Sequence, residues 1–121
     1  SDLLDWETKG GVKNAAQQDA LAARLTKERK IIESETAWAE IQRAHGELTK
    51  QIQAAAKISQ IQTAKAEAER VKLSRGRTLT SQVIMAEQDA AEAELTLTKL
   101  KVAQRKLETQ GRLFINLEEG T

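Results

Sequence analysis

The sequence predicts an all-α protein, a long antiparallel helical hairpin with coiled-coil-like pairing of its two arms. Three observations support this fold class. Ala, Gln, Lys, Glu and Leu dominate the 121 residues, and no proline is present to stop a helix. Apolar residues recur at alternating spacings of four and three in both halves of the chain. The halves are separated by one short break, "LSRGRTLT", at residues 73–80.

The N-terminal half is expected to be almost entirely one helix. Residues 1–14 contain Gly10 and Gly11 and are expected to form an irregular lead-in. From about residue 15 to residue 72 the chain contains no glycine except Gly46. At about 1.5 Å per residue, a continuous helix of this length approaches ~90 Å.

The C-terminal half supplies the second arm, which is expected from about residue 80 to residue 114. The predicted hairpin as a whole covers residues 15–116, with its turn near residues 74–79, and residues 117–121 are expected to be a C-terminal tail. The first arm is longer than the second, so its N-terminal end has no partner in this sequence. That overhang suggests that the chain is a segment of something larger.

Residue types at the break explain why one helix ends and another begins there. Lys72 and Arg75 complement the negative end of the first helix dipole. Gly76 can adopt the left-handed conformation that closes a helix C-terminus without a Cβ penalty. Thr78 or Thr80 can then act as the N-cap of the second helix. A tight helical hairpin is therefore expected.

The second arm carries two apolar stripes. The first follows coiled-coil spacing and consists of Leu79, Val83, Ala86, Ala90, Ala93, Leu97, Leu100 and Leu107. The second consists of Ile84, Ala91, Leu95 and Val102. It lies roughly 150° around the helix from the first. Two nearly opposite stripes suggest a helix with neighbours on both sides, as in a curved wall.

The first arm keeps the same rhythm and then loses it. Its apolar stripe consists of Trp38, Ile41, His45, Leu48, Ile52 and Ala55. The apolar residues Ile58, Ile61 and Ala68 then fall out of register, so a strict supercoil is not expected throughout. The many alanines permit close helix approach but each buries little area, which predicts modest stability.

Charge and composition exclude several classes of function. Nineteen basic and eighteen acidic residues give a net charge of +1, which provides no overall field for nucleic acid or an acidic membrane. No cysteine is present, and the longest apolar run is far shorter than the ~20 residues needed to cross a bilayer. No nucleic-acid partner and no membrane contact from this segment are therefore expected.

No chemistry-bearing constellation is found, and the chain is not expected to be an enzyme. His45 is the only histidine and lies on the seam, where a packing role is favoured over a metal ligand. The acidic residues of the second arm are interpreted as solvated surface; they are Glu87, Asp89, Glu92 and Glu94. No catalytic residue, metal ligand or cofactor is assigned.

The basic cluster at the break has two interpretations. It consists of Arg70, Lys72, Arg75 and Arg77. The simpler interpretation is helix-dipole complementarity plus a solvated tip. The other is a docking surface for a second protein, carried far from the base by two long arms. Nucleic-acid binding is disfavoured because no aromatic residue lies nearby to stack on bases.

The break and the helix after it resemble a known family. Residues 72–97, "KLSRGRTLTSQVIMAEQDAAEAELTL", are similar to the periplasmic hairpin turn of the TolC-like outer-membrane efflux channels. The matching residues are Lys72, Leu73, Gly76, Thr78, Val83, Ala86 and Glu87. Upstream, "AARLTKERKIIESETAWAEIQRA" resembles the preceding family helix. Two residues depart from the family pattern: Leu73 replaces an aromatic residue, and Gln82 replaces an Asp that can take part in closing the channel.

The resemblance implies a fold and a role. Family members are homotrimers of Gram-negative bacteria, with a periplasmic α-barrel below an outer-membrane β-barrel. Each protomer contains two structural repeats, and this chain would be the α-barrel hairpin of one repeat. Their hairpin turns dock a periplasmic adaptor and, through it, an inner-membrane pump for efflux or secretion. By residue-by-residue correspondence, the adaptor-docking tip would be Leu73, Ser74, Arg75, Gly76, Arg77, Thr78 and Thr80. Arginines flank its glycine, so the partner's tip is expected to be complementary in charge.

Two other functions stay open at the level of the sequence. The chain could be the α-hairpin of the adaptor itself, since Leu73 and Thr80 have a compatible separation. Arg70, however, is one residue too close to Leu73 for that pattern. A structural coiled-coil scaffold would explain the composition and the hairpin, but not the register from Gly76 to Glu87.

Overall fold

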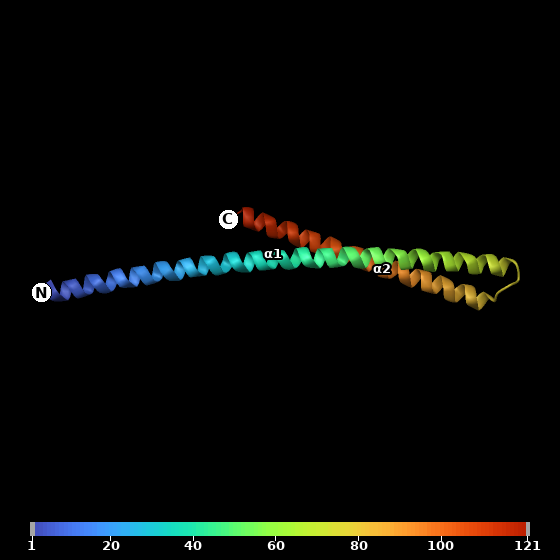
Figure 1. Ribbon diagram of the computed structural model, residues 1–121, viewed down its shortest axis with the longest axis horizontal. Helices are drawn as coiled ribbons and strands as arrows, with labels where there is room; N and C mark the ends of the chain where they lie inside the picture. The colour runs from blue at the N-terminus through green and yellow to red at the C-terminus, as the bar shows by residue number, and fades with distance from the viewer. Residues whose placement is uncertain (1, 121) are drawn as a thin grey trace. The chain divides into compact units, whose positions relative to one another are not determined.

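The protein consists of two helices joined by a short turn. The computed structural model describes the backbone of residues 2–120 and the side chains of residues 6–120. Helix α1 spans Asp2–Ser74 and helix α2 spans Thr80–Glu119, with no strand in the described chain (Figure 1). The predicted all-α hairpin is confirmed. Internal contacts divide the chain into residues 1–39 and residues 40–121, and each unit is described by itself.

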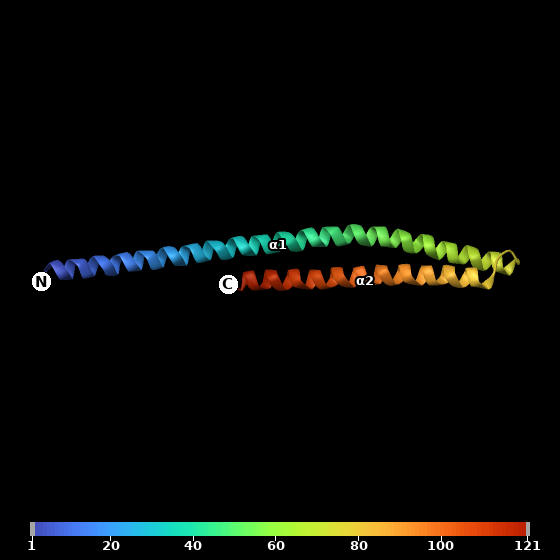
Figure 2. The same cartoon turned by 90° about the horizontal axis from the view of Figure 1, so that it is seen from below.

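In the unit formed by residues 40–121, α2 runs back along α1. Figures 1 and 2 show the two helices side by side next to the turn. The at least partly covered seam positions of α1 are Ile41, His45, Leu48, Ile52, Ala55, Ser59, Gln62, Ala66 and Glu69. Those of α2 are Val83, Ala86, Ala90, Ala93, Leu97, Leu100, Gln104, Leu107, Gly111 and Phe114. Both sets keep the alternating spacing of four and three without a break, which is the pattern of a paired coiled-coil seam.

The seam differs from its sequence-based prediction in the half next to the turn. Ile58 and Ile61, where the rhythm was expected to slip, are 52% and 57% exposed. Ser59, Gln62 and Ala66 hold the inward positions instead, so the register continues through small and polar residues. Hydrophobicity alone could not reveal these positions, because close helix approach selects for small size at Ser59 and Ala66, and Gln62 is polar and only partly covered.

Small side chains make up the fully covered part of the hairpin. The residues buried there are Ala55, Ser59, Ala66, Val83, Ala93 and Gly111, with Ala66 only 1% exposed. Among the described residues no large side chain is fully buried. Burial of apolar surface contributes roughly 25 cal/mol per Å², so a seam of such residues gives close contact but modest stabilisation.

The unit formed by residues 1–39 is helical where an irregular lead-in was expected at residues 1–14. α1 already includes residues 2–14, while Ser1 lies outside the described residues. Glycine inside a helix costs about 1 kcal/mol relative to alanine but does not by itself end it. Gly10 and Gly11 do not have positive φ angles, so neither closes the helix.

The C-terminal end is also more helical than expected. Residues 117–121 were expected to be a tail, but α2 continues to Glu119. The Gly120 N–H then donates to the Asn116 carbonyl oxygen at 3.0 Å and caps the last turn. Thr121 lies outside the described residues.

Candidate docking site at the hairpin turn

The end of α1 is closed by a Schellman motif centred on Gly76. Gly76 has a φ of +70°, the left-handed conformation expected of it. The Arg77 N–H donates to the Lys72 carbonyl oxygen at 2.8 Å, and the Gly76 N–H donates to that of Leu73 at 3.0 Å. These two bonds satisfy carbonyl groups that a helix end otherwise leaves open. The backbone of the turn is therefore held in one defined conformation.

Arg77 is not explained by the stability of this motif. A Schellman motif frequently places an apolar residue at the position of Arg77, in contact with the side chain at the position of Lys72 or one residue before it. Here Arg77 and Lys72 are cations, the residue before Lys72 is the apolar Val71, and all three side chains are exposed. Arg77 therefore keeps a positive charge in solvent where an apolar residue would often be found, which favours a role outside folding.

The start of α2 differs from the expectation that Thr78 or Thr80 is its N-cap. Leu79 occupies the N-cap position with φ −99° and ψ 151°, and its side chain makes no capping hydrogen bond. Thr80 is the first helical residue. The Thr78 hydroxyl instead donates to the Glu69 carboxylate at 3.0 Å. That bond ties the turn to α1, so Thr78 stabilises the tip through the first helix and not through the second.

The four cations of the basic cluster fall into two pairs. Arg70 donates to Glu87 at 2.7 Å and to Glu67 at 2.8 Å, and Lys72 donates to Glu69 at 3.2 Å. Neither Arg75 nor Arg77 forms an ion pair with any described residue. Arg70 therefore links the two helices and Lys72 pairs within α1. Arg75 and Arg77 remain available to a partner.

Hydrogen bonds across this cluster shift two pKa values. The bond from Thr78, followed by the bond from Lys72, lowers the pKa of the Glu69 carboxyl. The bonds to Glu87 and then Glu67 raise the pKa of Arg70 above its usual range. Both shifts stabilise the charged forms, and both groups lie at the surface.

The structure brings the predicted tip residues together at one end of the hairpin. Leu73 and Ser74 end α1, the residues from Arg75 to Thr78 form the turn, and Thr80 begins α2. The Ser74 hydroxyl donates to the Val71 carbonyl oxygen at 2.7 Å, so it caps its own helix.

Sequence reasoning missed Leu79 as a tip residue. Leu79 was assigned to the seam, yet it is 68% exposed beside the turn. Its spacing to Val83 is the helical one, but a seam position needs the residue to lie within the helix, and Leu79 precedes the first turn of α2. The absence of a Ser, Thr, Asp or Asn cap at this position was the only available signal.

Apolar stripes remain uncovered on both helices of the hairpin. On α2, Ile84, Leu95 and Val102 are 49%, 53% and 48% exposed, and Ala91 is also exposed. On α1, the exposed residues Ala54 and Ala68 extend the stripe begun by Ile58 and Ile61. Isolated exposed apolar residues need no explanation, but residues that recur at helical spacing along one face indicate a contact surface.

Polar contacts between the helices show which residues of α1 and α2 lie at the same height along the hairpin. His45 Nε2 lies 3.2 Å from Glu108 Oε1, and Gln104 Nε2 donates to the Thr49 hydroxyl at 2.8 Å. In addition to its predicted packing role, His45 therefore forms a hydrogen bond with Glu108 of α2. Counting on from these contacts places Ile58 level with Leu95, Ile61 level with Ala91 or its neighbour, and Ala68 close to Ile84.

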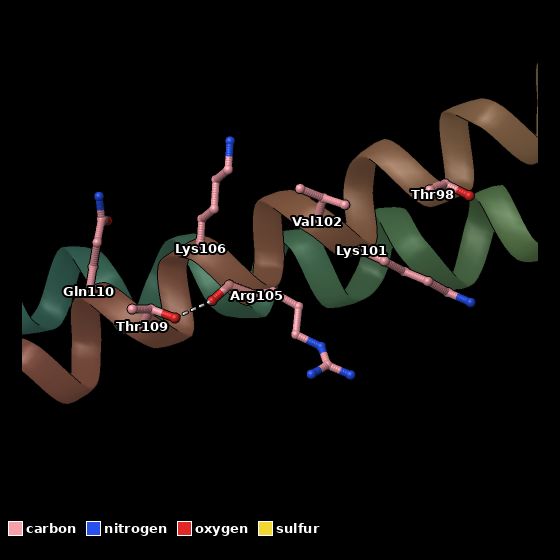
Figure 3. Close-up of a pocket in the computed structure, with 7 residues that line it drawn as sticks. All are labelled: Thr98, Lys101, Val102, Arg105, Lys106, Thr109 and Gln110. Carbon is pink, nitrogen blue, oxygen red and sulfur yellow. Dashed lines mark hydrogen bonds between the residues drawn. The ribbon is translucent and has the colours of Figure 1, made fainter.

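The concave surfaces are shallow and open. One, of about 600 Å³, follows a single face of α2 and is lined by Thr98, Lys101, Val102, Arg105, Lys106, Thr109 and Gln110 (Figure 3). Another, of about 310 Å³, lies between the helices beside Ile58 and Glu92. One helix face cannot enclose a small molecule, and Figure 3 shows the Lys106 and Arg105 side chains extending away from each other.

No metal cluster or membrane span is present in the described part of the chain. No three His, Cys, Asp or Glu side chains there are grouped closely enough to hold a metal ion. Within residues 2–120, neither helix has a stretch that is apolar enough to cross a membrane. Comparisons with protein-family models, curated proteins and solved structures find no match for this chain.

Proposed function

We propose that this chain is a wall segment of a trimeric outer-membrane export duct in the periplasm, and that its turn docks a periplasmic adaptor. Through the adaptor the duct would connect to an inner-membrane pump in an efflux or secretion system. The proposal rests on the resemblance of residues 72–97 to the TolC-like channels. One structural observation carries it further: the hairpin keeps an exposed apolar stripe on each helix and a free basic turn at its end.

The two stripes support a wall because they match in level and in size. A neighbouring hairpin with the same stripes, placed alongside without axial shift, would bring the α1 stripe of one hairpin to the α2 stripe of the next. Ile58 would then face Leu95, and the large Ile61 would face the small Ala91. Large residues opposite small ones allow two helices to interdigitate. This contact uses both stripes at once and can repeat around a ring.

The turn supports docking because its backbone is fixed while its charges are free. A contact at so small a tip is weak by itself. Repetition around a trimeric rim gives useful avidity, since each further contact is intramolecular. No catalytic role is proposed, because the described concave surfaces are open to solvent.

The docking assignment is tested in the full-length protein in its own cells. Charge reversal of both free arginines, Arg75→Glu with Arg77→Glu, is expected to abolish export while trimer assembly and membrane insertion are unchanged. The matched control reverses Lys99 and Lys101, two exposed cations of α2 away from the turn. The docking assignment is wrong if the tip variant exports normally and still cross-links to its adaptor.

The wall assignment has its own test. Cysteines placed at Ile61 and Ala91 of the 121-residue chain are expected to form disulfides between copies, giving covalent oligomers on a non-reducing gel. Cysteines at the exposed pair Lys57 and Lys106 serve as the control that should not cross-link, because these residues lie far apart in level. Equal cross-linking of both pairs would remove the wall assignment and leave the tip to be judged separately.

A further inference from the structure

We infer that the tip recognises a protein surface that combines carboxylates with an apolar recess, and that Leu79 enters this recess while Arg75 and Arg77 bind the carboxylates. The inference rests on the proposed docking function and names the chemistry of the partner. It adds Leu79 to the docking residues. It also excludes Arg70, Lys72 and Thr78 from direct contact with the partner.

The four cations at the tip differ in whether they are paired. Arg70 and Lys72 are already neutralised by Glu67, Glu69 and Glu87 within the hairpin. A partner that used them would have to break the pair of Arg70 with Glu87 between the helices, or the pairs with Glu67 and Glu69 within α1. Arg75 and Arg77 have no such partner among the described residues. Guanidinium groups bind carboxylates through paired N–H donors, so two free arginines on a fixed turn select for acidic side chains.

Leu79 is the apolar part of the proposed docking surface. It is 68% exposed at the N-cap of α2, a position that favours Ser, Thr, Asp, Asn or Gly. The capping preference is not met, and the leucine buries little surface within the chain. Folding therefore explains neither its identity nor its exposure. An apolar side chain next to free cations fits the usual composition of a docking surface, which has an apolar centre and a polar rim.

These residues favour a protein partner over other anionic partners. Phosphate-bearing polymers would satisfy the arginines equally well, but their charged backbones offer a leucine no apolar contact. Nucleic-acid surfaces engage aromatic side chains by stacking, and no aromatic residue lies within the turn. The combination of Leu79 with two arginines therefore favours an acidic protein tip.

The fixed turn makes such recognition specific. Gly76 and the two Schellman bonds hold the backbone, and the Thr78 bond to Glu69 ties it to α1. Leu79 and Arg77 are consequently presented from a backbone that needs no reordering on binding. Preorganisation of this kind reduces the entropic penalty of association.

The test uses a photoreactive amino acid at position 79 of the full-length protein, in its own cells. Position 113 is the matched control, because Leu113 is 58% exposed on α2 but lies far from the turn. Cross-linking to a protein other than a copy of this chain is expected at position 79 and not at 113. The cross-linked peptide of the partner is expected to carry at least two Asp or Glu residues beside apolar ones.

Charge variants complete the test. Arg75→Glu with Arg77→Glu is expected to reduce cross-linking from position 79 by about tenfold or more, the change that losing one charge-assisted contact produces. Replacing the partner's carboxylates by lysine should restore it. Reversal of Lys99 and Lys101 should leave it unchanged.

Each outcome decides the inference. Cross-linking to a peptide without carboxylates, cross-linking that survives the double reversal, or none at position 79 would overturn it. If the uncharged peptide belongs to an export adaptor, the proposed function stands and the inference fails. If the acidic peptide belongs to a protein unrelated to export, the inference stands and the proposed function fails.

Discussion

Gly76 determines the turn at the scale of single residues, and Gly46 provides a contrast within the same chain. Both lack any atom within 4 Å of an added Cβ, so neither site is limited by space. They differ in backbone conformation, because only Gly76 has a positive φ. Glycine is needed at the first site for its conformation, whereas at the second it only weakens a helix.

This contrast gives a paired prediction. Gly76→Ala is expected to destabilise the hairpin by about 1 kcal/mol or more, because alanine is strained in the left-handed region. Gly46→Ala is expected to stabilise it by about 0.5–1 kcal/mol, since alanine is the better helix former. The free energy of unfolding, measured by urea denaturation of both variants and the parent protein, checks the signs. Two changes of the same sign would contradict the argument.

The Thr78 hydroxyl offers a second test at this scale, through the pKa of Glu69. Thr78→Val removes the hydrogen bond and should move this lowered pKa back toward its ordinary value. Thr78→Ser, which keeps a hydroxyl, should leave it low. An NMR titration of the Glu69 side-chain carboxyl carbon measures the shift.

The sign of the pH dependence follows from the direction of this shift. A lowered folded-state pKa means that the bond stabilises the tip above the ordinary carboxyl pKa. The stabilisation is lost as the pH falls through the lowered value. The valine variant should therefore lose this part of its pH dependence, and an unchanged Glu69 titration would contradict the assigned bond.

At the scale of the helices, the close contact at Ala66 gives a prediction with an internal control. Ala66 is 1% exposed in the seam, so Ala66→Leu would force the two helices apart. Overpacking of this kind typically costs 1–3 kcal/mol. Ala68, two residues away, is exposed, and Ala68→Leu is expected to change stability by no more than about 0.5 kcal/mol. Thermal unfolding followed by circular dichroism compares the two; equal destabilisation would contradict the seam assignment.

The helices also show what periodicity could and could not predict. The seam of α2 followed from Val83, Ala86 and Ala90, because these residues are both apolar and inward. The turn-proximal seam of α1 did not follow, because Ser59 and Gln62 are inward without being apolar. Apolar spacing identifies a buried face only where the contact is wide enough for large side chains. Where helices come close, size matters more than polarity.

At the scale of the whole molecule, the sequence predicted the hairpin and the location of its tip, but not the partition of charges there. Gly76 and the absence of proline are features of the local sequence, and such features can be interpreted without knowing the fold. Whether Arg70 is free depends partly on Glu87, which lies across the turn in α2. The exposure of Leu79 likewise depends on where α2 begins, and helix boundaries are the least readable feature of a sequence.

The two units of the chain are expected to differ in local stability. Side chains of residues 6–33 are all exposed, so this part of α1 gains almost nothing from burial. Isolated helices in water are marginal, since most helical stability in proteins comes from packing of one face. Residues 40–121 contain a long seam between α1 and α2, including the covered layers at Ala66 and Ala93.

Amide hydrogen exchange of the 121-residue chain tests this difference. Amides of residues 8–30 are expected to exchange about a hundredfold faster or more than those next to Ala66 and Ala93, because opening the first group exposes no buried surface. A variant comprising residues 40–121 should unfold at the same urea midpoint as the seam amides of the full chain. Uniform protection along α1 would mean that its first part is covered in solution, and a second copy of the chain would then be sought by sedimentation equilibrium.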